Sequence, residues 1–224
     1  MQGAEGIPVR IACITDLHGA AAALERVLDH AGPLDAVLLG GDITHFGSPI
    51  DGQRVVEVAQ RRAPLVLAVV GNTDSAAIQE RLVGLGVSLH GRGIVSGPVG
   101  LHGLSGIPPW KRGMYGLSEE ELDAALESGY AQIAGCKQHI LLAHVPPHGL
   151  GLDLTSSGVH AGSRAVRGFI QERRPALVLC GHVHEARGIE NLGPTTVVNC
   201  GRGGMGEYAL VEAGGEVRAE LREA

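Results

Sequence analysis

The segment VRIACITDLH, residues 9–18, decides the fold. It is a short apolar run rich in β-branched residues, and it ends in Asp16-Leu-His18. An apolar run without alternation is typical of a strand that is covered on both faces. A helical pattern follows over Gly19–Ala31. We therefore expect a buried strand, two polar side chains where it ends, and a helix that returns along the sheet.

The same unit recurs along the chain. Further strands are expected at Ala36–Leu39, Leu65–Val70, His139–Ala143 and Ala176–Cys180, and further helices at Gln53–Arg62, Ala76–Val83, Ser118 to about Gly135 and Arg164–Arg173. The last forty residues instead favour hairpins, with strands at Gly188–Ile189, Thr195–Asn199, Tyr208–Val211 and Val217–Leu221. The alternation predicts a mostly parallel sheet with helices outside, and the late strands predict a second layer of sheet. Since no linker or repeat interrupts the pattern, we expect residues 1–224 to form a single domain.

Composition limits the classes of partner. The hydrophobic share of 44% and the charged share of 19% are ordinary for a soluble globular protein. The net charge is −6 and no basic run exceeds two residues, whereas proteins that bind long nucleic acid rely on many Lys and Arg contacts. With two Phe, three Tyr and one Trp, no aromatic stacking platform is expected either. We therefore expect a small substrate and no long nucleic acid.

The cysteines and the hydropathy pattern indicate the compartment. The four cysteines form no Cys-x-x-Cys pair, and Cys13 and Cys180 lie inside apolar runs, where a thiol acts as a small hydrophobe. The first ten residues lack the pattern of a signal peptide. Apolar runs such as Leu65–Val70 are far shorter than the ~20 residues of a membrane helix. We expect a cytoplasmic protein without membrane association.

Residue types that bind metals follow five of the expected strands. They are Asp16, His18, Asp42, Asn72, His144, His182 and His184. In open α/β sheets, ligands bind where the loops leave the carboxyl ends of the strands. Taken alone, an Asp-x-His or a Gly-Asp pair is more often a cap or a turn. Five such groups, each placed after an apolar strand, predict one common site.

The mixture of ligand types indicates which metals would fit. Imidazole together with carboxylate oxygen suits Zn, Mn, Fe, Co or Ni, and the absence of thiolates argues against a structural zinc site. In Asp-x-His and His-x-His the two side chains share a face, because alternate residues of an extended segment do so. Gly41, Gly71 and Gly181 each precede a ligand, and we expect them to permit tight turns there.

The ordered motifs Asp-x-His, Gly-Asp, Gly-Asn, a lone His and Gly-His-x-His resemble those of the calcineurin-like metallophosphoesterase superfamily. The chain departs from many members because Thr73 and Asp74 follow Asn72 where a histidine is common, and this departure resembles the small prokaryotic branch. The resemblance spans nearly the whole chain. It implies the α/β fold of that family, a four-layer αββα sandwich of two mixed sheets flanked by helices.

The resemblance also implies two divalent metal ions and their ligands. Asp16, His18 and His184 would hold one ion, Asn72, His144 and His182 the other, and Asp42 would bridge them. A hydroxide between the ions would attack a small phosphodiester or phosphomonoester. Two ions, two carboxylates and a hydroxide give a site charge of about +1, which suits a phosphate ester.

The residue that assists the leaving group is left open. Thr73 cannot act as a general acid near neutral pH. His148 and His160, in the Gly-rich loop after His144, are candidates for an acid or a phosphate contact, although a surface role is the simpler interpretation of each.

Several other polar residues are weaker candidates for a role at the predicted site. His45 follows Asp42 and Arg202 lies in a Gly-rich turn, so both are candidates for substrate proximity. Asp74 is a candidate for orienting a ligand or capping the helix after it. The remaining histidines are interpreted as structural or exposed: His30, His90, His102 and His139.

Two functions of different classes remain. The first is metal-dependent hydrolysis of a phosphate ester, with diesters favoured because a monoester benefits more from a well-placed acid. The second is a non-catalytic scaffold with the same fold. All seven ligand positions hold competent residues, which favours the enzyme.

Overall fold

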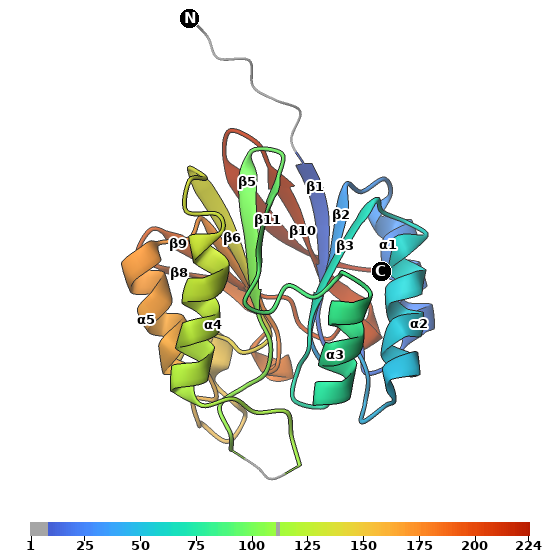
Figure 1. The fold of residues 1–224 in the computed structure, drawn as a ribbon, viewed down its shortest axis with the longest axis horizontal. Coiled ribbons are helices and arrows are strands. Elements are labelled where there is room, and N and C mark those ends of the chain that lie inside the picture. Colours follow the sequence, from blue (N-terminus) through green and yellow to red (C-terminus); the bar gives the residue numbers. More distant parts are fainter. Residues whose placement is uncertain (1–8, 111–112) are drawn as a thin grey trace, which may run out of the picture.

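The computed structural model describes residues 9–110 and 113–224, shown as a ribbon in Figure 1. The helices are α1 (Ala21–Ala31), α2 (Pro49–Gln60), α3 (Ala76–Gly84), α4 (Glu119–Ala131) and α5 (Arg164–Arg173). The strands are β1 (Val9–Ile14), β2 (Ala36–Gly40), β3 (Leu65–Val69), β4 (Gly93–Ser96), β5 (Val99–Leu104), β6 (Gln138–Ala143), β7 (Leu177–Cys180), β8 (Gly188–Leu192), β9 (Thr195–Asn199), β10 (Glu207–Ala213) and β11 (Val217–Glu223). Most of the segment behind the signal-peptide expectation, residues 1–8, lies outside the described ranges.

The strands form two mixed sheets. The first has the order β11-β10-β1-β2-β3 and the second the order β4-β5-β6-β7-β9-β8. Strands β1, β2 and β3 are parallel, as are β5, β6, β7 and β9, while the remaining strands are antiparallel to their neighbours. The expectation that the late strands build the second layer is therefore only partly right. β8 and β9 extend the second sheet, but β10 and β11 return to complete the first.

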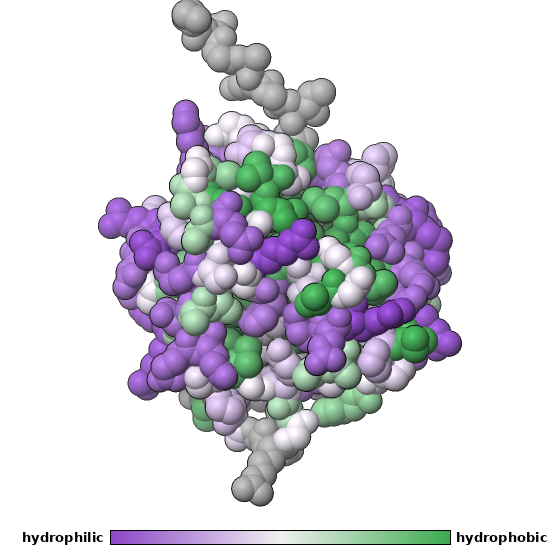
Figure 2. All heavy atoms as spheres, in the orientation of Figure 1, coloured by the Kyte–Doolittle hydropathy of each residue, from purple (hydrophilic) through white to green (hydrophobic). Residues whose placement is uncertain are grey.

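Helices cover the outer face of each sheet. In Figure 1, α1, α2 and α3 lie on one side of the strands and α4 and α5 on the other. Figure 2 shows hydrophilic side chains over the helices at both sides of this face. The predicted four-layer αββα sandwich is confirmed.

Three apolar clusters fill the spaces between the four layers, which explains the character of the first strand. Ile11 and Cys13 belong to the cluster between the two sheets, whereas Ala12 and Ile14 belong to the cluster beneath α1 and α2. Alternate residues of β1 thus point to opposite faces, and both faces are buried. The buried part of this strand, residues 11–14, accordingly has only apolar side chains, whereas Arg10 lies in its partly exposed beginning.

Two helix boundaries differ from their predictions by about one turn, and the others by two residues or fewer. Helix α2 begins at Pro49 rather than Gln53, because the Ser48 side chain and Asp51 form a capping box. Gly52 inside this helix permits close packing, since a Cβ there would lie 3.1 Å from the Ile78 side chain. Helix α4 ends at Ala131, about one turn before the predicted Gly135.

The cysteines are free thiols, and three of them are buried. Burial raises the pKa of the Cys13 and Cys180 thiols, which keeps them neutral. They pack as small hydrophobes, as their surroundings in sequence predict. Among the described residues, no helix has the length and apolar character needed to cross a membrane.

Candidate metal centre

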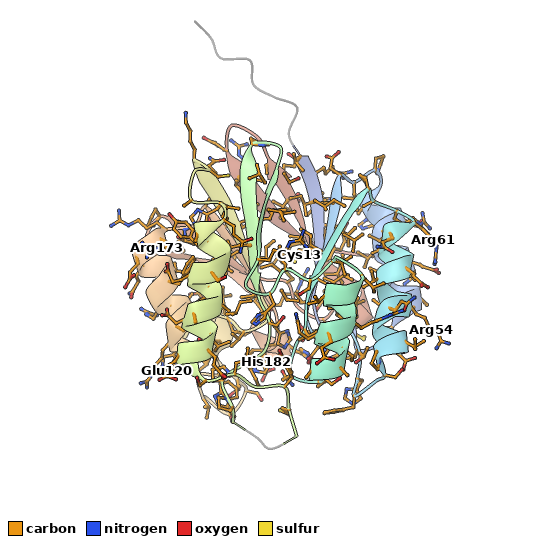
Figure 3. All side chains as sticks on the ribbon, in the orientation of Figure 1. Cys13, Arg54, Arg61, Glu120, Arg173 and His182 are labelled. Atoms are coloured by element: carbon orange, nitrogen blue, oxygen red, sulfur yellow. The ribbon has the colours of Figure 1, made fainter. Side chains whose placement is uncertain are left out.

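The seven predicted ligands gather where both sheets present the carboxyl ends of their parallel strands. Figure 3 labels His182 between the lower ends of α3 and α4, at the edge where these loops meet. Backbone hydrogen bonds join the loops to one another. Asp16 N donates to Gly41 O at 3.0 Å, His18 N to Asp42 O at 2.8 Å, and Gly181 N to His144 O at 3.1 Å. The first two bonds join loops of one sheet, and the third joins loops of the other. His182 N links the two sets because it donates to Asp16 Oδ2 at 3.0 Å.

The first group of ligand atoms comprises Asp16, His18 and His184, whose atoms lie within 4.8 Å of one another. His184 Nε2 lies 3.1 Å from Asp16 Oδ1 and 3.4 Å from His18 Nε2. His18 Nε2 also lies 3.8 Å from Asp42 Oδ2. The group thus offers two imidazole nitrogens and one carboxylate, with the Asp42 carboxylate close to His18, a donor set that suits a divalent transition metal.

The second group brings an imidazole nitrogen close to two oxygen atoms. His144 Nδ1 lies 3.0 Å from the Gly40 carbonyl, which can only accept, so this nitrogen carries a proton. His144 Nε2 lies 3.2 Å from Asn72 Oδ1 and 3.6 Å from Asp42 Oδ1. Ligand atoms of Asp16, Asp42 and His144 also lie within 4.8 Å of one another. Imidazole nitrogen, carboxylate oxygen and amide oxygen that converge in this way fit a divalent transition metal.

His182 joins the second group through its ring. Its ring centroid lies 5.2 Å from that of His144, and its backbone N donates to Asp16 Oδ2 at 3.0 Å. Burial lowers the pKa of His182 to about 3, so the ring is neutral and able to act as a ligand at neutral pH.

The other ionisable ligands of the first group are also shifted. Burial acts to raise the pKa of Asp16, but the hydrogen bond from His184 and the positive charges nearby outweigh it and lower this pKa. The same hydrogen bond raises the pKa of His184. Burial lowers the pKa of His18 against the attraction of Asp42 and Asp16. The metal-free site is thus an ionised carboxylate among imidazoles.

Four of the seven predicted ligands have left-handed backbone conformations, which are uncommon outside glycine. The φ values are 55° for Asp16, 47° for His18, 46° for Asp42 and 67° for His182. Conformations of this kind each cost about 1–3 kcal/mol and persist only where the surroundings enforce them. Within the described ranges, only Phe46 and Arg174 share this feature among non-glycine residues. Backbone strain is therefore concentrated at this edge of the sheets.

The three glycines beside the ligands provide space more than turns. A Cβ on Gly41 would collide with the His144 ring, one on Gly71 with Asp42, and one on Gly181 with Asp16. Only Gly41 has a positive φ, at 91°. The expectation of tight turns is thus right for Gly41 alone. Gly71 and Gly181 are needed because neighbouring ligand side chains occupy the space of a Cβ.

Comparison with known proteins identifies the family. The family model for calcineurin-like phosphoesterases matches residues 9–186. The chain belongs to this family. An uncharacterised protein of Methanocaldococcus jannaschii is 31% identical over 204 residues, covering 85% of this chain and 87% of the relative. The phosphoesterase is also similar in fold to a protein of Thermus thermophilus (TM-score 0.74, 18% identity, 96% and 99% covered) and to a dimetal phosphatase from Danio rerio (TM-score 0.53, 13% identity, 94% and 98% covered).

Thr73 and Asp74 of this phosphoesterase are buried and hold the ligand loops together. Thr73 N donates to Asp42 Oδ1 at 2.8 Å, and the Thr73 hydroxyl donates to Thr44 O at 2.9 Å. The Asp74 carboxylate accepts hydrogen bonds from the backbone N of Ile43, Thr44 and Gly71. The helix cap that follows is Ser75, whose side chain accepts from Ile78 N. Asp74 is therefore a positioning residue for two ligand loops.

His148 and His160 meet at a different carboxylate. His160 Nδ1 lies 2.7 Å from Asp153 Oδ1, and His148 Nδ1 lies 3.6 Å from Asp153 Oδ2. Asp153 is fully buried and also accepts from the backbone N of Gly149, Leu150 and Gly162. Among the described contacts, neither imidazole hydrogen-bonds to or stacks on any of the seven ligands. The structure brings the two candidates together around Asp153, which organises their loop.

His45 and Arg202 lie nearer to the ligands. The exposed ring of His45 lies 5.3 Å from the ring of His18. Arg202, half exposed and 3.5 Å from Glu207, contributes a positive charge that opposes protonation of His184. The structure thus places both predicted candidates beside the first group of ligands.

Three residues at this edge were missed by the sequence reasoning. Trp110 lies with its ring centroid 5.5 Å from that of His182, Phe46 lies 5.1 Å from the ring of His45, and the Met114 sulfur lies 3.8 Å from Asn72 Nδ2. The expectation of no aromatic stacking platform for long nucleic acid is not tested by two such side chains. The composition gives the number of aromatic residues, whereas their position at this edge depends on the fold.

Proposed function

We propose that the chain hydrolyses a small phosphate ester, preferring diesters, with two divalent metal ions. The observation that carries the proposal is the convergence of His144 Nε2 on Asn72 Oδ1 and Asp42 Oδ1, beside the group of ligand atoms from Asp16, His18 and His184. The match of residues 9–186 to the family model for calcineurin-like phosphoesterases supports this chemistry.

We assign the ligands to two sets as the family resemblance implies, and the two groups of neighbouring ligand atoms support this assignment. Asp16, His18 and His184 would hold one ion, Asn72, His144 and His182 the other, with Asp42 shared between them. The two ions, when bound, would supply an activated hydroxide and positive charge for the phosphoryl oxygens.

The protein's own contribution is orientation. The Gly40 carbonyl fixes the tautomer of His144, and Thr73 N fixes one oxygen of Asp42. His45 is the exposed imidazole beside a ligand, so it is better placed than Thr73, His148 or His160 to deliver a proton to a leaving group. Thr73 Oγ1, 3.4 Å from His18 Nδ1, helps to orient that ring instead.

Size, charge and compartment complete the proposal. A net charge of −6 favours a small substrate over long nucleic acid. The free thiols favour a reducing compartment such as the cytoplasm. The three apolar clusters share the two sheets, which supports one domain over residues 1–224.

The test compares hydrolysis of bis-p-nitrophenyl phosphate and p-nitrophenyl phosphate with Mn, Fe, Co, Ni, Zn or no metal. We expect metal-dependent turnover, with the diester preferred, that is lost in Asp42→Ala. Asp123→Asn, on the exposed face of α4, is the matched control. Calorimetry counts bound ions independently of turnover. Two bound ions without hydrolysis would favour the scaffold, and fewer than two ions would contradict the site itself.

A further inference from the structure

Two of the chain's six Phe, Trp and Tyr residues are largely exposed. Trp110 is 50% exposed and Phe46 is 60% exposed, whereas Tyr208 and Phe169 are buried in the core. A single exposed apolar side chain is normal and needs no explanation. Trp110 and Phe46 are different from such isolated side chains, because both lie at the edge of the metal centre. Each lies near a different group of ligands.

Trp110 is the better placed of the two for recognising a substrate. Its ring lies 5.5 Å from the ring of His182 with an interplanar angle of 49°, so it rests against a predicted ligand of the second ion. Half of its surface remains open to solvent. An indole is the largest aromatic side chain and stacks well on other planar rings.

The backbone around Trp110 is tied to the metal centre. Trp110 N donates to Pro108 O at 2.9 Å, and a bridge between Ile107 and Gly116 closes the base of the loop. Tyr115 N donates to the carbonyl of Asn72 at 3.1 Å. Pro108 and Pro109, with their fixed φ, stiffen the approach. The described residues 107–110 and 113–116 are thus joined at their base, and the second of these segments is tied directly to a ligand loop.

We infer that Trp110 stacks on a planar aromatic ring of the substrate, which makes nucleoside phosphates the substrate class. This inference rests on the proposed function, because the phosphate must sit at the metal centre for the ring to reach Trp110. Every nucleobase offers a π-face, and base–aromatic stacking does not require hydrogen bonds that distinguish one base from another. The protein would therefore bind different nucleobases with little discrimination among them.

The experiment compares two ligands that differ only in the base, adenosine 5′-monophosphate and ribose 5-phosphate. Binding to the Zn²⁺-loaded protein is measured by calorimetry and by tryptophan fluorescence. Trp110 is the only tryptophan, so any quenching by the base reports this side chain directly. We expect the nucleotide to bind about tenfold more tightly than the sugar phosphate and to quench the emission, an effect of the size that one stacked base produces.

Variants separate stacking from other effects. Trp110→Ala should lower the affinity for the nucleotide to that of ribose 5-phosphate, while Trp110→Phe should retain part of the difference. Val83→Ala, another exposed apolar residue, is the matched control and should change neither affinity. Equal affinities of the wild-type protein for the two ligands, or unchanged nucleotide binding by Trp110→Ala, would overturn the inference. If neither ligand binds, the inference is also overturned, and hydrolysis of bis-p-nitrophenyl phosphate by the same protein shows separately whether the proposed function holds.

Discussion

Strand β6 and its continuation carry two buried histidines with opposite surroundings. His139 lies near the amino end of the strand and His144 directly after its carboxyl end. His144 faces the carboxylate of Asp42 and the amide oxygen of Asn72. His139 instead packs among the rings of its neighbours, and its Nε2 has no hydrogen-bond partner among the described groups.

His102 on β5 belongs with His139. Its ring lies 5.5 Å from His139 and 5.2 Å from Phe169, and neither of its nitrogens has a hydrogen-bond partner within the described structure. Burial lowers the pKa of His102 to about 3, the same value as for the predicted ligand His182. A depressed pKa therefore does not distinguish a site from a core. Convergent ligand atoms do, and they occur only on the His144 side of this comparison.

The largest predicted difference is between His144→Phe and His139→Phe. Loss of His144 removes a ligand, so we expect metal-dependent turnover to fall by more than about a hundredfold, since disturbing only an outer partner of a metal costs 10–100-fold. His139→Phe replaces one buried ring by another and should retain turnover. Turnover and bound metal are measured for both variants. Equal losses of turnover and bound metal in the two variants would contradict the distinction between the two histidine environments.

The second prediction concerns acid stability of the metal-free protein. Burial holds the folded-state pKa of His102 at about 3, whereas an unfolded histidine titrates near 6.5. Between these values the unfolded chain binds the proton and the folded one does not, so acid favours unfolding. The contribution of His102 to the free energy of unfolding is fully present above pH 6.5 and is lost as the pH falls towards 3.

We expect His102 to account for about 1–2 kcal/mol of the stability lost between pH 7 and pH 5. Urea unfolding with a chelator, at both pH values, measures this loss. His102→Phe should lose less stability over the same interval than the wild-type protein. Parallel losses in both proteins would show that His102 already finds a proton acceptor in the folded state.

His102→Phe also gives a smaller effect at neutral pH. The wild-type ring buries two nitrogens without partners, and an unsatisfied buried polar group costs about 1–3 kcal/mol. The larger phenyl ring must fit among Tyr130 and Phe169, which offsets part of the gain. We expect a net stabilisation of about 1 kcal/mol at pH 7.5 in urea unfolding. A destabilised variant would indicate that a water molecule or a tight packing requirement stabilises the imidazole.

The difference between His144 and His139 could be predicted in part from the sequence. His144 could be assigned to the site and His139 to the structure from their places at the two ends of one expected strand. The left-handed conformation of His182 could not be predicted, because the backbone hydrogen bond from His182 to Asp16 enforces it across 166 residues. The place of Trp110 beside His182, far away in the sequence, could not be predicted from local patterns either. Local sequence patterns predict the helices, the strands and the positions where the strands end. Long-range contacts determine which residues lie at the rim of the metal centre.

The prediction with the smallest expected effect concerns backbone strain at the edge of the sheets where the ligands lie. It does not involve the ligands themselves. Phe46 has a φ of 53° and is 60% exposed, so its ring gains little from burial while its backbone is strained. A left-handed conformation costs an L-residue about 1–2 kcal/mol, and glycine adopts it freely but loses about 0.5–1 kcal/mol of entropy on folding. Phe46→Gly should therefore be more stable by about 0.5–1 kcal/mol.

Phe46→Ala is the matched control for this last prediction, because it removes the same ring but retains the Cβ that makes the conformation unfavourable. We expect no gain in stability from it, as judged by thermal unfolding of the metal-free proteins side by side. Turnover of both variants should fall equally if the ring contributes to the rim through His45. A gain of the same size in both would place the cost in the exposed ring rather than in the backbone. The strain at the ligand edge would then have to be sought in Asp16, His18, Asp42 and His182 alone.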